Sequence, residues 1–175
     1  MSARLDAVVD GLLRIGLQVR ETDTVTDAFL PRVRIRNGGL EVAPGARISD
    51  VLHESGHLAV MPDRFRKYLD GDLRIGIERA FAECSSGEGV EARALLHADE
   101  QAATAWAFAF GASLGLPAER VIEDRDYQGD GASQRLALSV GRHAGIQALR
   151  GGGMCAMAYE TDSLQWPVLR RWVQP

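Results

Sequence analysis

The chain has 175 residues, 46% of them hydrophobic and 25% charged, which is an ordinary composition for a soluble globular protein. Its net charge of -4 provides no basic surface for nucleic acid or an anionic membrane, so neither is expected as a partner. Two cysteines, Cys84 and Cys155, exclude a disulfide scaffold, and no apolar run is long enough to cross a bilayer. The length predicts a single domain over residues 1–175. Because no signal peptide is recognisable, the cytoplasm is the expected compartment.

Hydrophobic spacing divides the first third of the chain into a helix, a hairpin and a second helix. The predicted elements are a helix over 2–19, a loop over 22–27, strands over 32–36 and 40–42, and a helix over about 47–60. The hairpin prediction rests on alternating polar and apolar residues on both sides of the turn signal Asn37-Gly38-Gly39. Pro62 is expected to end the second helix.

The remainder of the chain is predicted to be mostly helical. The expected elements are a short helix over 64–69, a strand or helix over 73–77, a loop over 84–89, a long helix over about 91–114, a short helix over 117–122, a polar loop over 123–131, a helix spanning 136–149, and a terminal helix over 166–172 docked by its tryptophans. The fold class predicted is therefore α+β, mostly helical, with a small hairpin or sheet beside the helix at 47–60.

The helix at 47–60 carries the sequence His53-Glu54-Ser55-Gly56-His57. Residues four apart share a helix face, so His53 and His57 can direct two imidazoles at one point. Two such histidines form half of a zinc site, and Glu54 occupies the position of a general base. The apolar stripe of this helix lies elsewhere, at Ile48, Val51, Leu52, Ser55, Leu58 and Ala59. The alternative is that both histidines are ordinary residues of an amphipathic helix.

A catalytic zinc site needs a third protein ligand, and Glu100 is the predicted one. It lies in the helix over 91–114 among small apolar residues, where a buried acid needs a partner. Asp99 is the close rival, because the sequence does not determine the rotation of this helix. Both acids could also simply be solvated near the helix start.

Asp63 is a further candidate for the third ligand. Residues 53–63 have the length of the pattern His-Glu-x-x-His-x-x-Gly-x-x-His/Asp, with Asp63 at its last position. The glycine of that pattern makes a sharp turn, but Val60 stands there, and a β-branched residue resists such a conformation. Glu100 therefore remains the predicted ligand.

The predicted chemistry assigns Glu54 as the general base that takes a proton from zinc-bound water as the water attacks a carbonyl. A separate donor to the developing oxyanion is also expected. Tyr127, His143 and Tyr159 are the available residue types, and Tyr127 is chosen because it lies in a polar, glycine-bearing loop. An ordinary surface tyrosine is the alternative.

His53-Glu54-Ser55-Gly56-His57 resembles the motif of the zincins, and with Glu100 the chain looks like a small gluzincin, the thermolysin-like group. More of the chain resembles a family of uncharacterised bacterial proteins, over Phe29-Leu30-Pro31, the motif helix, Asp99-Glu100 with Ala105-Trp106-Ala107, and Arg170-Arg171-Trp172. The resemblance implies a zincin-like metal-binding domain but no substrate. One departure is Thr104, which stands four residues after the Glu ligand, where the thermolysin group has an acid.

Two functions follow from these patterns. The first is a zinc-dependent hydrolase, a metallopeptidase of narrow specificity acting on a peptide or protein, in which substrate can add to a strand edge of the hairpin. The second is a non-proteolytic metal-binding or regulatory protein on a zincin-like fold, which suits a small cytoplasmic protein. An open metal position beside a free strand edge favours the first function.

Overall fold

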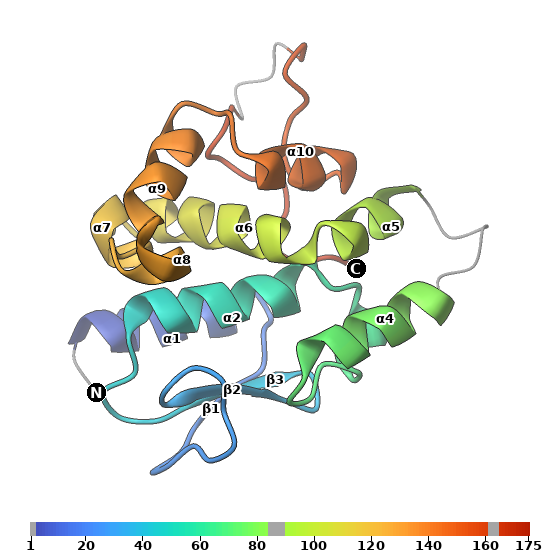
Figure 1. The fold of residues 1–175 in the computed structure, drawn as a ribbon. Helices are drawn as coiled ribbons and strands as arrows, with labels where there is room; N and C mark the ends of the chain where they lie inside the picture. The colour runs from blue at the N-terminus through green and yellow to red at the C-terminus, as the bar shows by residue number, and fades with distance from the viewer. Residues whose placement is uncertain (1–2, 84–89, 161–164) are drawn as a thin grey trace.

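The computed structural model describes residues 3–83, 90–160 and 165–175 (Figure 1). Within these ranges it has three strands and ten helices: α1 Ala3–Arg14, β1 Val19–Glu21, β2 Val33–Arg36, β3 Gly39–Val42, α2 Ile48–Val60, α3 Asp63–Arg66, α4 Leu73–Glu83, α5 Val90–His97, α6 Asp99–Ser113, α7 Ala118–Val121, α8 Asp126–Gly129, α9 Gly131–Ser139 and α10 Ala144–Gly151. The predicted α+β class is confirmed. No helix of the described ranges is long and apolar enough to cross a membrane.

The predicted hairpin is confirmed as β2 and β3, which pair antiparallel with Ile35 opposite Leu40. Asn37 and Gly38 join them with φ angles of 48° and 76°, the left-handed values that a two-residue hairpin turn requires. A Cβ at Gly38 would also lie only 2.7 Å from the Arg66 carbonyl oxygen. The sheet is mixed, because β1 adds to the other side of β3 in parallel, giving the order β1-β3-β2.

The elements stack in layers around α2, as Figure 1 shows: the sheet lies on one side of this helix, α6 on the other, and α10 beyond α6. Gly56 allows α2 and α6 to approach closely, since a Cβ there would lie 2.5 Å from the carbonyl oxygen of Ala103. Val51, Leu52 and Leu58 of α2 are fully buried between the layers. The close crossing brings the two elements with the predicted ligands into direct contact.

Residues 172–174 join the last turn of α2 to the middle of α6. The indole N–H of Trp106, in α6, donates to the carbonyl of Trp172 at 2.7 Å. The backbone N–H of Gln174 donates to the carbonyl of Ala59, in the last turn of α2, at 2.9 Å. The carbonyl oxygens near the end of α2, which the helix itself leaves without partners, are in this way partly satisfied by the chain's last residues.

The predicted helix over 2–19 is too long. It ends at Arg14, and Gly16 follows with a φ of 91°, a value that stops a right-handed helix. Residues 19–21 form β1 instead, with Val19 paired to Leu40. The apolar spacing continues through Leu17 because this residue is also buried, although outside the helix.

Two predicted long helices are each divided in the structure. The helix predicted over 91–114 breaks at Ala98, whose φ and ψ of -115° and 28° are not helical, so that α6 begins at Asp99. The helix predicted over 136–149 breaks at Gly141, which has a φ of 72° and separates α9 from α10. The first break matters for the site, because it gives α6 its own direction relative to α5.

The terminal helix predicted over 166–172 is wrong, because the segment lies without a helix and is joined to Cys155 through an isolated bridge at Leu169. Its docking by tryptophans is confirmed: Trp166 stacks on Phe108, and Trp172 contacts Trp106 and Phe110 edge-on. Residues 73–77, left open between strand and helix, belong to α4, and the short helix near 64–69 is α3. The predicted loop over 84–89 lies outside the described residues.

Candidate metal centre

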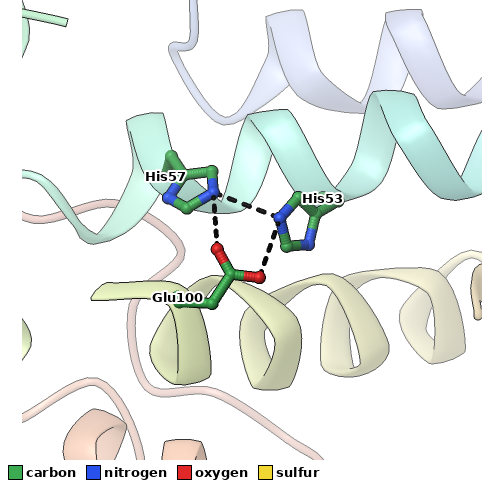
Figure 2. A group of neighbouring side chains, drawn as sticks. All are labelled: His53, His57 and Glu100. Atoms are coloured by element: carbon green, nitrogen blue, oxygen red, sulfur yellow. Dashed lines mark hydrogen bonds and ion pairs between the residues drawn. The ribbon is translucent and has the colours of Figure 1, made fainter. Parts of the chain in front are cut away.

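Three predicted ligands meet at the crossing of α2 and α6 (Figure 2). His53 and His57 extend from one face of α2, and Glu100 extends from the first turn of α6. The two Nε2 atoms are 3.2 Å apart. One carboxylate oxygen of Glu100 lies 3.4 Å from His53 Nε2, and the other lies 3.5 Å from His57 Nε2. These three side chains are called the triad below.

The triad is compact enough to hold one metal ion, because one ligand atom can be taken from each residue such that all three lie within 4.8 Å of one another. Ligand atoms of a tetrahedral zinc ion, bonded at about 2.0–2.2 Å, lie about 3.3–3.6 Å from one another. The two Nε2 atoms, 3.2 Å apart, are close to an edge of such a tetrahedron, whereas the 3.4 and 3.5 Å distances to Glu100 belong to its two different carboxylate oxygens, so both oxygens would have to face one ion for all three distances to apply. Two imidazoles and a carboxylate also form a ligand set that catalytic zinc sites use, with a fourth position left for water or substrate.

Asp99 contacts His57 on the side of the ring that faces away from the triad. Its Oδ2 lies 2.6 Å from His57 Nδ1, the ring nitrogen that does not face the triad, and the Asp99 side chain is buried. A carboxylate only accepts, so Nδ1 carries the proton of this bond and Nε2 is left for the triad. The sequence left Asp99 and Glu100 as rival ligands, and the structure places only Glu100 among the three.

The electrostatic environment of His57 favours its charged form. Burial opposes the charge, but the Asp99 carboxylate, with smaller contributions from Glu54 and Glu100, outweighs burial and raises the pKa of His57 to about 9. Below that pH, the metal-free site therefore holds a proton on His57. With Nδ1 committed to Asp99, a proton on Nε2 lies in the place where a metal cation would replace it.

Tyr127 contacts His53 from the side away from the triad. Its hydroxyl lies 3.2 Å from His53 Nδ1 and 2.7 Å from the hydroxyl of Thr104. The role predicted for Tyr127 was to donate a hydrogen bond to an oxyanion, but this geometry places its hydroxyl against the ring of His53, a predicted metal ligand. Tyr127 has a φ of 55°, and the segment is anchored by an ion pair between the preceding Asp126 and Arg47.

Glu54 lies beside the triad in a cleft of about 1210 Å³ that is also lined by His53, His57, Glu100 and Tyr127. Burial raises the pKa of the Glu54 carboxyl, and the two histidines oppose this shift. Within the described residues its side chain has no hydrogen-bonding partner. A carboxylate in this position can accept a proton from a water molecule in the cleft.

The outer strand of the sheet, β2, forms part of the same cleft through Val33 and Ile35. Arg32 accepts a hydrogen bond from Ala43 of the neighbouring strand, so the antiparallel alternation turns the backbone groups of Val33 and Ile35 toward the outer edge. Gly71 already donates to the carbonyl of Ile35 at 3.3 Å. Val33 and Ile35 are only 1% and 2% exposed, so this edge is covered along both residues.

The other sequence candidates lie outside the triad. The Asp63 side chain is 73% exposed and pairs with Arg66 at 2.7 Å, which excludes it from the ligand set. His143 accepts a hydrogen bond from the Gly145 backbone at the start of α10, and Tyr159 is exposed. Sequence analysis did not identify Arg47 and Asp126, and no local pattern could have revealed a pair so distant in the chain.

Comparisons of the chain with protein-family models, with curated proteins and with solved structures gave no match.

Proposed function

We propose that the protein is a zinc-dependent hydrolase with a zincin-like fold, acting as a metallopeptidase of narrow specificity. The observation that supports this proposal is the triad: two imidazoles and a carboxylate, a ligand set that catalytic zinc sites use, each offer one ligand atom within 4.8 Å of the others. The Glu54 carboxylate, from the same helix, lies beside them in the cleft.

The side chains divide the chemistry between them. His53, His57 and Glu100 would hold the zinc ion, and Asp99 orients His57 through its Nδ1. When bound, zinc would act as a Lewis acid toward a substrate carbonyl and make water more acidic. Glu54 would accept the proton of the attacking water and later return it to the leaving group.

A peptide substrate is favoured by the position of β2. This outer strand lies in the wall of the cleft, and an extended peptide could add to its edge through backbone hydrogen bonds once the segments that bury Val33 and Ile35 move aside. The second candidate function, a non-proteolytic metal-binding or regulatory protein, is favoured by one contact. The hydrogen bond from Gly71 to Ile35 covers part of this edge and shortens the segment that a peptide can use.

The proposal is tested first by the metal content of purified protein, measured by elemental analysis. We expect about one zinc ion per chain, because the site has a single set of three ligands. Glu100→Ala should remove the zinc, whereas Asp63→Ala, which changes an exposed acid outside the triad, should retain it. A protein that cannot be loaded with zinc, cobalt or manganese would contradict the proposal, and loss in Asp63→Ala alone would indicate the other ligand set.

Cleavage of a peptide library then distinguishes a hydrolase from a metal-binding protein without activity. Glu54→Gln is the matched control. This variant keeps the shape of the side chain and should keep the zinc, but it removes the base. We expect a rate loss of about 10²–10⁴-fold, the usual contribution of a positioned general base. Zinc-loaded protein that cleaves no peptide would instead favour the non-proteolytic function.

A further inference from the structure

We propose that a chain of three hydrogen bonds, running from His53 through Tyr127 and Thr104 to the Glu100 backbone, holds His53 in the tautomer that can bind a metal. The three bonds measure 3.2 Å from His53 Nδ1 to the Tyr127 hydroxyl, 2.7 Å from there to the Thr104 hydroxyl, and 2.9 Å from Thr104 to the Glu100 carbonyl oxygen. The metal follows from the proposed function, but the tautomer is a property of the chain alone.

The direction of this chain follows from its last member. The Glu100 carbonyl can only accept, so the single hydroxyl hydrogen of Thr104 must point to it. The Thr104 oxygen can then only accept a hydrogen bond from Tyr127, so the phenol hydrogen of Tyr127 points to Thr104. The Tyr127 oxygen is thereby left as an acceptor, and His53 Nδ1 must supply the proton of the third bond. In the opposite direction the Thr104 hydrogen would be used on Tyr127, and the bond to Glu100 would be lost.

The tautomer decides whether His53 can serve as a ligand. A neutral imidazole carries one proton, and with that proton on Nδ1 the lone pair of Nε2 faces the triad. The Nε2 atom is also the one that lies near His57 and Glu100. Tyr127 is partly buried, and its phenol is a hydrogen-bond donor as well as an acceptor, so it can fill its place in the chain.

The backbone around Tyr127 is shaped to deliver this hydroxyl. Tyr127 and Gln128 both have left-handed φ values, 55° and 61°, which are uncommon for residues with a side chain. Asp126 holds the turn in place, because it pairs with Arg47 and accepts from the Glu123 backbone N–H at 2.7 Å. Two consecutive strained residues at a cleft are typical of a functional segment.

The chain also accounts for Thr104. Its hydroxyl contacts the Tyr127 hydroxyl at 2.7 Å, and within the described residues no direct hydrogen bond from Thr104 to His53 is present. The Tyr127 hydroxyl links the two. Both Tyr127 and Thr104 are therefore positioning residues, and they link two ligands, because the chain begins at His53 and ends on the backbone of Glu100.

The test is nitrogen-15 NMR of the histidine rings in the metal-free protein, combined with zinc affinity from chelator competition. In the wild type we expect the Nδ1–H form of neutral His53. Tyr127→Phe and Thr104→Val should each shift His53 toward the Nε2–H form and weaken zinc binding about 10–100-fold, the usual effect of losing a partner of a metal-binding histidine. Thr104→Ser should restore both readouts, because it keeps the hydroxyl.

His57 provides the internal control, because its Nδ1 is held by Asp99 and the nitrogen-15 signals of its ring should not change in any of these variants. A wild-type His53 in the Nε2–H form would overturn the proposal. So would a Tyr127→Phe protein with both His53 tautomer and zinc affinity unchanged. Failure of the proposed function can be distinguished from failure of the tautomer proposal. A wild-type protein that never binds zinc would still show its His53 tautomer in the NMR spectrum.

Discussion

The two histidines of the triad differ in the group that contacts Nδ1, the ring nitrogen that faces away from the triad. His57 faces a buried carboxylate, Asp99, whereas His53 faces the neutral hydroxyl of Tyr127. A carboxylate increases the basicity of the ring it binds more than a hydroxyl does. His57 is therefore expected to be the stronger ligand of the two, and the more sensitive to loss of its partner.

Asp99→Asn tests this difference directly. The amide keeps the size of the side chain but removes the charge, so we expect zinc affinity to fall about 10–100-fold above pH 9, where a proton on His57 no longer competes with zinc in the wild type. Chelator competition followed by calorimetry measures the loss. Asp63→Asn is the control, because Asp63 is exposed and should leave the affinity unchanged. Equal affinities for wild type and Asp99→Asn would show that this contact does not support the ligand.

Zinc binding should become stronger as the pH rises toward about 9. The pKa of His57 in the folded protein, about 9, lies above its ordinary value of 6.5, so the proton on His57 stabilises the metal-free fold fully below 6.5 and less as the pH rises through 9. Zinc must displace this proton. Calorimetry at neutral pH in buffers of different ionisation enthalpy should show release of about one proton. Absence of proton release would contradict a charged His57.

For single residues of the site, the sequence predicts the arrangement of those that lie close together on one helix. His53, Glu54 and His57 lie within one and a half helical turns, so their common face follows from helix geometry alone. Asp99 and Glu100 could not be separated, because their directions depend on the non-helical Ala98 that precedes them. The contact of Tyr127 with His53 joins distant parts of the chain and could not be derived from spacing.

Between elements, the important contact is the crossing of α2 and α6. Gly56 lies between the two histidines in the sequence, and its missing side chain allows the Ala103 backbone to lie against α2. The distance from Glu100 to the histidines depends on that approach, because Glu100 extends from α6 one turn before Ala103. The crossing is therefore part of the site, although neither residue is a ligand.

Gly56→Ala should force the two helices apart. The added Cβ would lie 2.5 Å from the Ala103 carbonyl oxygen, and backbone must move to relieve this contact. We expect a loss of about 1–3 kcal/mol in the free energy of unfolding, together with weaker zinc binding. Urea unfolding measures the first. Gly39→Ala is the matched control, because its Cβ would meet neighbours at an ordinary 3.5 Å, and an equal loss there would argue against the crossing.

Helices and strands could be predicted from the sequence where their own residues determine the local backbone conformation. The hairpin of β2 and β3 follows from the turn residues Asn37 and Gly38, which accept left-handed backbone. The break between α5 and α6 left no signal, because Ala98 is itself a good helix former and its conformation is set by packing. The three-residue β1 exists only because β3 is there to pair with it.

For the molecule as a whole, zinc removal should lower stability. A ligand that binds only the folded state stabilises it by about 4 kcal/mol at 1,000 times its Kd. For a chain of this length that corresponds to a rise in Tm on the order of 10 °C. Scanning calorimetry with zinc and with a chelator measures the shift. Glu100→Ala should show no shift on adding zinc, and a shift of wild-type size in this variant would place the metal elsewhere.

The contacts of residues 172–174 with Ala59 and Trp106 have a consequence for synthesis. All three triad ligands have left the ribosome once residue 100 is exposed, but the segment that joins the last turn of α2 to the middle of α6 is translated much later. A nascent chain can thus present its ligands to cellular zinc before their support exists. The supported site requires translation through residue 174, and a ribosome that stalls before residue 172 would display ligands without that support.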